Sequence, residues 1–406
     1  MLPAVLAVIV FLWLLRATNV ALSFALIPRL GPVPPRKAGA PFVSIVVPAR
    51  NEERDVEDAT RSKCRQDDPS FEVVVVEDRS SDGTRRILAG LEREFPRVLS
   101  VVEGVDPPLD WLGKPHALDE GARAARAQAP SEWLIFSDAD VHFAPDLVAR
   151  ALAHVERERL DFLSLFPTLE MKSFGERLMT PSAATVAFCY LPCWLMNVPG
   201  ARLFGGGAGA FNLVRRDLFE KIGGHAALRN SVVDDVQLGH RARLAGGRTG
   251  FALALDVVSV RIYHGFRETA KGFAKNGYYG IGANLLLAVL SLSWFFLEGV
   301  LPFVLLAASA LERWPPAAAV LSTHPGAAPA FFTFKEILLA ACVVALTLLV
   351  RGALHLKLRY SWLGIVLHPV WVAALTGIFA WSTFVNGVLG RNEWRGRVRD
   401  AGALEF

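Results

Sequence analysis

The stretch Glu72-Val-Val-Val-Val-Glu-Asp-Arg-Ser-Ser-Asp-Gly-Thr84 decides the fold of this 406-residue chain. Four valines end in two adjacent carboxylates, Glu77 and Asp78, and a Ser/Asp/Gly turn follows. Buried parallel strands have such continuous apolar runs, and ligands of open α/β sheets bind beyond the carboxyl ends of the strands. A carboxylate at this position can hold a ribose, a base or a metal ion.

The same layout recurs in Trp133-Leu-Ile-Phe-Ser-Asp-Ala-Asp140, where an apolar run is followed by Asp138 and Asp140. Apolar runs of strand length occur at residues 42–47, 71–76, 98–102 and 133–136. Helical segments separate them, from a cap at Asn51 to about residue 65 and over 84–95, 114–127 and 144–157. This alternation predicts an α/β domain with a mostly parallel sheet over about residues 41–280.

Long apolar runs frame this domain. Residues 2–27 contain one charge, Arg16, residues 281–311 contain one, Glu298, and residues 364–389 contain none. Each run is long enough to cross a bilayer, which takes about 20 residues. Residues 337–350 are apolar over a shorter length that is typical of a re-entrant segment. We predict four membrane segments and favour an N-terminal anchor over a cleaved signal peptide.

The basic residues after the first apolar run predict its sidedness. Arg29, Arg36 and Lys37 follow this run directly, and positive charge favours the cytoplasmic side. We expect an integral protein of the bacterial inner membrane with a cytoplasmic α/β domain. Its parts are an N-terminal segment at 1–30, the domain at 41–280, membrane segments at 281–390 and a basic tail at 391–406, whose side we leave open. The net charge of +4 is small and dispersed, which argues against nucleic acid as a partner.

Residues 179–204 are apolar and aromatic but interrupted by Pro181, Pro192 and Pro199. We interpret them as segments lying in the membrane interface, with a pair of core helices as the alternative. The four cysteines have no metal-binding spacing and are interpreted as structural.

Five motifs in order resemble family 2 glycosyltransferases with the GT-A fold, over about residues 42–280. They are Val47-Pro-Ala-Arg-Asn-Glu-Glu53, Glu77-Asp-Arg-Ser-Ser-Asp-Gly-Thr84, Gly113-Lys-Pro-His-Ala-Leu118, Ser137-Asp-Ala-Asp140 and Val232-Val-Asp-Asp-Val-Gln-Leu-Gly239. The flanking membrane segments are similar to the branch with lipid acceptors, such as ceramide glucosyltransferases and hopanoid-associated glycosyltransferases.

The resemblance implies donor-binding roles for several residues. Pro48, Arg50 and Glu52 would line the nucleoside pocket, and Asp78 would hold the uracil or the ribose. Lys114, after Gly113, would lie near the donor. The alternatives are a turn cap for Asp78 and a solvated helix start for Lys114.

Asp138 and Asp140 resemble the metal-binding Asp-x-Asp motif of this family. Two hard oxygen ligands suit Mg²⁺ or Mn²⁺, which would bridge the diphosphate of the donor. Asp138 would thus also contact the donor. His142 is either a third ligand or a polar residue on the surface. The alternative for the pair is two exposed carboxylates in a turn.

Asp234 and Asp235 resemble the acidic pair that supplies the catalytic base. Inversion by a single displacement needs one carboxylate to take the proton of the acceptor hydroxyl, and we assign this role to Asp235. Asp234 would orient Asp235 or raise its pKa. Acidic residues are also favoured at a helix N-terminus, and both readings can hold together.

Two further segments have open alternatives. The run Gly205-Gly-Gly-Ala-Gly209 either flanks the bound sugars or forms a flexible hinge. After the acidic pair, processive members of the family carry a Gln/Arg-x-x-Arg-Trp motif, and the matching residues 267–275 of this chain lack Arg-Trp. Lys271 and Lys275 would bind the diphosphate instead, or would contact anionic lipid. Arg16 and Glu298 each need a partner inside the apolar runs, which could be each other or a lipid head group.

Together these features predict an inverting, metal-dependent glycosyltransferase. It would transfer one sugar from a nucleotide-diphosphate donor, with UDP expected, to the hydroxyl of a membrane lipid. The alternatives are a processive polysaccharide synthase of the same family and a catalytically silent membrane scaffold.

Overall fold

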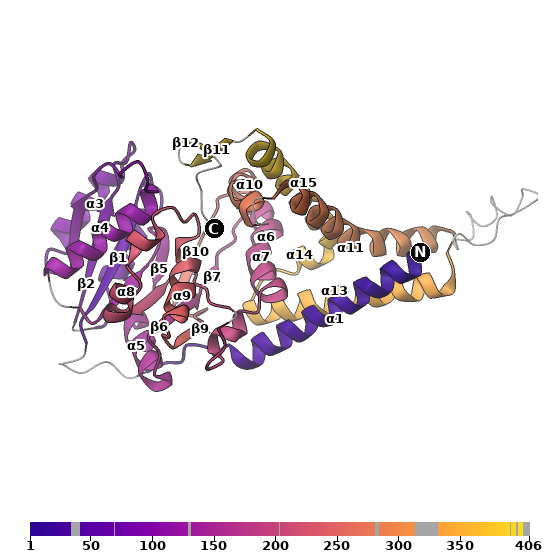
Figure 1. Cartoon of the computed structure of the whole chain (residues 1–406), viewed down its shortest axis with the longest axis horizontal. Helices are drawn as coiled ribbons and strands as arrows, with labels where there is room; N and C mark the ends of the chain where they lie inside the picture. Colours follow the sequence, from indigo (N-terminus) through magenta and orange to yellow (C-terminus); the bar gives the residue numbers. More distant parts are fainter. Residues whose placement is uncertain are drawn as a thin grey trace, which may run out of the picture. The chain divides into compact units, whose positions relative to one another are not determined.

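The computed structural model describes residues 1–33, 41–68, 70–128, 131–202, 204–280, 284–312, 332–389, 391–394 and 397–400. These residues form two compact units. The first, here called the sheet unit, comprises Leu22–Glu170 and Pro192–Ile262. The second, here called the helical unit, comprises Met1–Ala21, Met171–Leu191 and the described residues from Tyr263 to Asp400 (Figure 1).

A seven-stranded sheet organises the sheet unit, in the order β3-β2-β1-β4-β8-β6-β9. All neighbouring strands in it are parallel except for the two pairings of β8, which confirms the expected GT-A-like, mostly parallel α/β architecture. Valine and isoleucine fill the central strands because both faces of the sheet are covered. In this order, the strands are β3 (Leu99–Glu103), β2 (Phe71–Glu77), β1 (Val43–Ala49), β4 (Trp133–Phe136), β8 (Asn212–Arg215), β6 (Phe162–Phe166) and β9 (Thr249–Leu253).

The register of the sheet brings several strand ends to one edge. Ala49 at the end of β1 pairs with Glu77 at the end of β2, and Val46 of β1 pairs with Phe136 at the end of β4. The segments that follow these three strands, which carry Arg50, Asp78 and Asp138, therefore leave the sheet on the same side. Strands lie about 4.8 Å apart, so β2 and β4, on either side of β1, are separated by roughly 10 Å.

Helices connect these strands much as the sequence predicts, with ends shifted by a few residues. Helix α4 packs against β1 and β2. A second sheet has three strands in the order β5-β10-β7, all of which follow β4 in the sequence. The helices are α2 (Val56–Cys64), α3 (Thr84–Glu94), α4 (Gly113–Gln128), α5 (Leu147–Glu158), α8 (Arg216–Lys221) and α9 (Asp234–Leu244), and the short strands are β5 (Val141–Phe143), β7 (Thr168–Leu169) and β10 (Val258–Val260).

The expected helix cap at Asn51 is wrong. Helix α2 begins only at Val56, and Asn51 has a left-handed backbone with φ of 52°. Its side-chain oxygen accepts a hydrogen bond from the backbone of Ser81 at 2.8 Å. Asn51 therefore joins the loops after β1 and β2, a role for which its tolerance of the left-handed region suits it.

Arg243 of α9 anchors the segment that begins at Pro192. Its guanidinium is buried and donates to the carbonyl oxygens of Leu195, Met196 and Val198 at 2.8–2.9 Å, and also to that of Ala201. The segment contains a 3₁₀ helix, Cys193–Asn197. Residues 179–204 thus divide between the two units at Leu191, and their place in a membrane interface stays a prediction.

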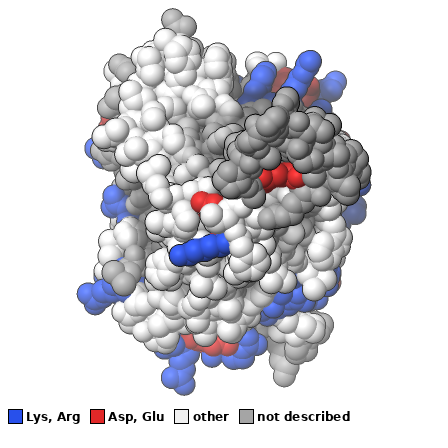
Figure 2. Space-filling model, turned by 90° about the vertical axis from the view of Figure 1, so that its right-hand side faces the viewer, with Lys and Arg blue, Asp and Glu red and all other residues white. Residues whose placement is uncertain are grey.

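Among the described residues, four helices are long and apolar enough to cross a membrane. The helical unit holds Leu285–Glu312, Phe334–Leu358 and His368–Val388, together with the part of Leu2–Leu26 up to Ala21. The surface that this unit presents in Figure 2 has few charged side chains. The re-entrant interpretation of residues 337–350 is wrong, because they belong to one 25-residue helix. Arg351, His355 and Lys357 interrupt the apolar pattern but not the helix.

The elements of the helical unit follow the chain. They are α1 (Leu2–Leu26), α6 (Phe174–Met179), α7 (Pro181–Thr185), a π-helical turn (Val186–Tyr190), α10 (Phe266–Gly280), α11 (Leu285–Glu312), α13 (Phe334–Leu358), α14 (Leu363–Val366), α15 (His368–Ser382), a second π-helical turn (Thr383–Val388), and strands β11 (Arg391–Trp394) and β12 (Arg397–Asp400). Leu6, Leu305 and Ala340 bring α1, α11 and α13 into one apolar cluster.

The two isolated charges of the apolar runs pair with each other. The guanidinium of Arg16 on α1 lies 2.9 Å from the carboxylate of Glu298 on α11. The Tyr190 hydroxyl donates to the same carboxylate at 3.2 Å, and the Arg16 guanidinium lies 4.5 Å from the centre of the Tyr190 ring. This contact satisfies the expectation that each charge needs a partner.

Replacing Arg243 with Met is expected to destabilise the sheet unit by roughly 2–3 kcal/mol, because several buried carbonyl oxygens lose a charged donor. The measurement is the unfolding temperature of the purified full chain. Arg241→Met, at an exposed position on the same helix, is the control and is expected to leave the temperature unchanged. Equal effects of the two substitutions would contradict the anchoring role.

Candidate active site

Asp78 lies at the end of β2, buried and clasped by two arginines. The Arg50 guanidinium, beyond β1, donates to the Asp78 carbonyl at 2.7 Å and approaches its Oδ2 at 3.5 Å. Arg79 donates to Oδ1 at 2.9 Å. Oδ1 is thus occupied, while the long contact leaves Oδ2 able to accept a stronger hydrogen bond. The turn-cap alternative does not hold for Asp78, because no backbone N–H of the described residues donates to its carboxylate.

The neighbouring carboxylate, Glu77, has a structural role. Its Oε1 accepts from the backbone of Ser80 at 2.6 Å, and its Oε2 accepts from Arg85 at 3.0 Å. Pro48 pairs with Val76 in the register of β1 and β2, and the backbone of Glu52 donates to the Thr84 hydroxyl at 2.8 Å. Arg50, Glu52 and Asp78 therefore lie in the adjoining segments that follow β1 and β2, and Pro48 lies at the end of β1. Their donor-binding roles stay predictions.

Lys114, in the first turn of α4, connects two parts of the candidate site. Its ammonium lies 2.7 Å from Oδ1 of Asp138, beyond β4, and 3.7 Å from Oδ1 of Asp234, at the start of α9. Burial alone would lower the pKa of Lys114, but the surrounding carboxylates outweigh burial and raise it. Lys114 is therefore a permanent cation within an acidic cluster, which differs from the solvated helix start considered above.

Asp234 and Asp235 occupy the first turn of α9, so the helix-terminus interpretation holds for their position. Burial nevertheless raises the pKa of Asp234 to about 7, against the opposing effect of Lys114. Burial also raises the pKa of Asp235, and Asp138 adds to this shift. The Asp235 side chain is less buried than that of Asp234, and its Oδ1 accepts from the backbone of Val236 at 2.9 Å.

Asp138 and Asp140 form an electrostatically coupled pair between β4 and β5. Burial, followed by the charge of Asp138, raises the pKa of Asp140 to about 6. Two carboxylates whose charges disfavour each other's ionisation favour a cation near them, and hard oxygen donors suit Mg²⁺ or Mn²⁺. The donor set therefore fits a divalent metal ion, with Asp138 and Asp140 as the residues that would hold it.

His142 does not extend this pair. It lies on β5, opposite Ser259 of β10. Among the described residues, no group of three or more His, Cys, Asp or Glu side chains has an arrangement that could hold a metal ion. Any remaining ligands of an ion at Asp138 and Asp140 would come from the donor diphosphate or from water.

Lys63 is a charged residue of this region that the sequence analysis missed. It is fully buried on α2, its ammonium donates to the carbonyl of Val141, and it lies 5.2 Å from the centre of the Phe143 ring. Burial lowers the pKa of Lys63 to about 8, although the charges of Asp140 and Asp138 oppose this shift. The helical spacing of α2 offered no signal, because Lys63 takes a core-facing position that an apolar residue would normally occupy.

The glycine run before β8 packs directly against the acidic cluster. A Cβ at Gly207 would lie 2.2 Å from the backbone oxygen of Asp235, and one at Gly209 would lie 2.4 Å from Oδ2 of Asp138. A side chain at Gly207 would therefore displace the backbone of Asp235, and one at Gly209 would displace the Asp138 carboxylate. This close approach replaces the hinge interpretation for Gly207 and Gly209.

The two lysines predicted to bind the diphosphate lie in the other unit. Lys271 and Lys275 are on α10 of the helical unit, one turn apart, whereas Lys114 and the carboxylates belong to the sheet unit. Both the donor-binding and the lipid-contacting interpretations of these lysines stay predictions.

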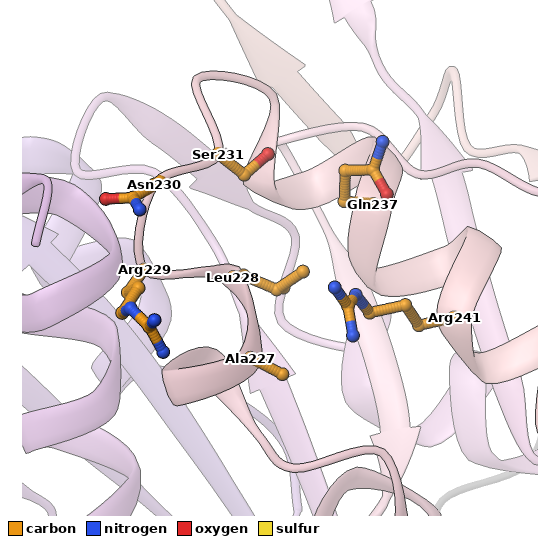
Figure 3. A pocket seen from close by; sticks show the side chains of 7 residues that line it. All are labelled: Ala227, Leu228, Arg229, Asn230, Ser231, Gln237 and Arg241. Carbon is orange, nitrogen blue, oxygen red and sulfur yellow. The ribbon is translucent and has the colours of Figure 1, made fainter. Parts of the chain in front are cut away.

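A hollow of about 260 Å³ lies beside α9, apart from the carboxylates. Figure 3 shows Gln237 and Arg241 of α9 on one side of it and the segment from Ala227 to Ser231 on the other. Arg229 of this segment pairs with Asp110 at 3.1 Å, and its backbone oxygen accepts from Leu112, just before α4. The hollow is polar and lacks an acidic lining residue.

The fold and this acidic edge define a GT-A-like domain. The chain belongs to the glycosyltransferase-like family 2, whose model matches residues 40–276, more than half of the 406 residues.

Two curated relatives are β-monoglucosyldiacylglycerol synthase of Trichormus variabilis and 4,4'-diaponeurosporenoate glycosyltransferase of Staphylococcus aureus. The first is 27% identical over 210 residues, which cover 50% of this chain and 42% of the relative. The second is 25% identical over 251 residues, which cover 60% of this chain and 62% of the relative. The chain thus spans less than two thirds of either relative.

Among solved structures, the chain is similar to a mannosyltransferase from Pyrobaculum calidifontis in complex with GDP-Man and Mn²⁺. The TM-score is 0.49 at 21% identity, and the match covers 85% of this chain and 97% of the other.

Gly207→Ala is expected to lower the unfolding temperature, since the added methyl group overlaps the Asp235 backbone; overpacking of this kind costs roughly 1–3 kcal/mol. Gly206→Ala is the matched control, because its Cβ would meet no atom closer than 3.7 Å. Thermal unfolding of both variants measures the difference. A Gly207→Ala protein as stable as the control would show that the loop does not pack as described.

The raised pKa of Asp234 predicts a pH dependence of stability in metal-free protein. A carboxyl group whose pKa is higher in the folded state stabilises the fold at low pH, and this contribution is lost as the pH rises through about 7. Asp234→Asn removes this term. The difference in unfolding temperature, wild type minus variant, is therefore expected to fall between pH 5 and pH 8. A constant difference over this range would contradict the raised pKa.

Proposed function

We propose that this protein is an inverting glycosyltransferase. It transfers a single sugar from a nucleotide-diphosphate sugar, with UDP as the expected nucleotide, to the hydroxyl of a membrane lipid. The observation that carries this proposal is the gathering of Asp138, Asp234 and Asp235 around the Lys114 ammonium, at the edge where Asp78 also leaves the sheet.

Asp235 is the proposed base. The acceptor oxygen attacks the anomeric carbon while the hydroxyl proton passes to the Asp235 carboxylate, and the bond to the diphosphate breaks on the opposite face. A carboxylate with a raised pKa is a better proton acceptor than an ordinary one. Asp234, held 3.7 Å from Lys114, would keep the first turn of α9 and its neighbour in place.

Lys114 is proposed to stabilise the leaving group. Its ammonium is positive at all working pH values and lies at the carboxylate pair that would hold the metal, so it faces the charge that develops on the diphosphate. When bound by Asp138 and Asp140, a divalent cation would supply further charge neutralisation for the same diphosphate.

The loops after β1 and β2 are proposed to bind the nucleoside. Oδ2 of Asp78 can accept an N–H of the base or a ribose hydroxyl, since Arg79 engages only Oδ1. Arg50 would hold Asp78 in place through the Asp78 carbonyl. Pro48 and Glu52 would form the walls of this pocket.

The lipid acceptor is supported by two observations. The chain carries four helices suited to a membrane among its described residues, and the two relatives above are named as a monoglucosyldiacylglycerol synthase and a diaponeurosporenoate glycosyltransferase. We propose that the sheet unit lies on the cytoplasmic side of the bacterial inner membrane, where nucleotide sugars are available.

Asp235→Asn is expected to lower the transfer rate by roughly 10²–10⁴, the usual contribution of a general base, with little change in donor affinity. The substitution keeps the side-chain shape and removes the proton acceptor. The assay follows glycolipid formation by mass spectrometry of lipids from cells with wild type, variant or no protein, and calorimetry measures UDP-sugar binding.

Asp217→Asn is the matched control, because Asp217 is a largely exposed carboxylate of the sheet unit paired with Arg215. Full activity of Asp235→Asn would show that another group is the base. A lipid-linked polymer in place of a single added sugar would favour the processive synthase, and no binding of any nucleotide sugar would favour the scaffold.

A further inference from the structure

Arg351 is a buried charge in the helical unit that the proposed function does not use. It lies on α13, one of the helices suited to a membrane, and its side chain is 0% exposed. A charged side chain within such a helix costs roughly 2.5–3.5 kcal/mol on insertion scales, and such residues usually mark a function or a pairing. The other arginine of this kind, Arg16, has its counter-ion in Glu298.

Arg351 has no such counter-ion among the described residues. Its Nη1 donates to Nδ1 of His368 at 3.2 Å, and its guanidinium stacks 4.0 Å from the centre of the Trp371 ring. Trp371 is itself fixed, because its indole N–H donates to the Ser182 hydroxyl at 2.8 Å. Nε and Nη2 of Arg351 are buried and have no hydrogen-bond partner in the part of the chain that the structure describes.

A nitrogen of His355 is likewise buried and without a hydrogen-bond partner among the described residues. His355 is one helical turn further along α13, and its Nδ1 is engaged with the carbonyl of Ser361 at 2.6 Å, while its buried Nε2 has no partner among the described residues. Gly364 on α14 lies against both groups. A Cβ at Gly364 would be 3.3 Å from Arg351 Nη2 and 3.7 Å from His355 Nε2. Because Gly364 has no side chain, only the backbone of α14 covers the two nitrogens, and a Cβ there would already be crowded, at 3.2 Å from Cε1 of His355.

We propose that Arg351, His355 and Gly364 form a binding site for the acidic head group of a membrane lipid, either a phosphate monoester or a carboxylate. The head group would accept hydrogen bonds from Nε and Nη2 of Arg351 and supply the missing negative charge. Because Nδ1–H of His355 donates to Ser361, Nε2 is the acceptor nitrogen, and the P–OH of a phosphate monoester would donate to it. The head group would enter where the one-turn helix α14 covers these atoms.

The position of the site along its helices favours a lipid head group over a ligand from the bilayer centre. Arg351 is seven residues from Leu358, the last residue of α13, or roughly 10 Å at 1.5 Å per residue. The exposed Trp362 and the neighbouring Tyr360 follow this end, and such aromatic residues are typical of the head-group level. The N-terminus of α15, at His368, adds a favourable dipole for an anion.

The test is native mass spectrometry of the detergent-solubilised full chain without nucleotide, so its outcome does not depend on transferase activity. The probes are phosphatidic acid, oleic acid, phosphatidylcholine and inorganic phosphate. Wild type is expected to bind one phosphatidic acid or oleic acid at least tenfold more tightly than phosphatidylcholine, a difference of about 1.4 kcal/mol. The tighter of the two acids identifies the acidic group.

Arg351→Gln is expected to abolish this preference, and Gly364→Ala is expected to weaken it by filling the space beside Nη2 while Arg351 keeps its charge. Arg359→Asn, which removes an exposed charge just beyond the same helix, is the control and should bind as wild type does. A wild type without preference for acidic lipids overturns the proposal even if Arg351→Gln fails to fold. An unchanged preference in Gly364→Ala would also overturn the proposal. Equal competition by inorganic phosphate would overturn it too, because the ligand would then be free phosphate and not a lipid.

Discussion

The ammonium of Lys114 is the interaction on which the acidic edge of the sheet unit depends. Three carboxylates that come from two distant parts of the chain, Asp138, Asp234 and Asp235, would repel one another without it. Its contacts at 2.7 Å and 3.7 Å tie the end of β4 to the start of α9. The remaining like-charge repulsion and burial still raise the pKa values of Asp140 and Asp234. One ammonium therefore offsets only part of the charge of these carboxylates, so the cluster can accept further positive charge.

This arrangement is possible because backbone, rather than side chains, fills the space behind the carboxylates. Gly207 and Gly209 let the strand that enters β8 approach Asp235 and Asp138 within the distance that a methyl group would take up. The antiparallel pairing of β8 with β4 then places this loop at the end of β4. Two features therefore determine the position of the acidic residues. One is the register of the parallel strands, and the other is the close packing of the glycine run against Asp138 and Asp235.

The sequence predicted the strands and the acidic edge because both depend on local patterns. Apolar runs that end in carboxylates set the places of Asp78 and Asp138, and the structure brings them to one side of the sheet. Tertiary contacts decided what the sequence missed. Asn51 looks like a helix cap but joins two loops, and Lys63 is a core residue whose charge finds partners only in the fold. Likewise, residues 337–350 appeared too short to span a membrane because buried Arg351 interrupts their hydropathy.

The helical unit shows the same electrostatic constraint with two different solutions. Arg16 and Glu298 neutralise each other across α1 and α11, with Tyr190 completing the contact. Arg351 stacks on the ring of Trp371 and bonds the imidazole of His368, and these contacts orient the guanidinium without neutralising it. Among the described residues, a carboxylate lies beside Arg16 but none lies beside Arg351. The proposed partner for the charge of Arg351 is therefore a ligand from outside the chain. In a membrane segment near the head-group level, an acidic lipid supplies an anionic group that meets this requirement.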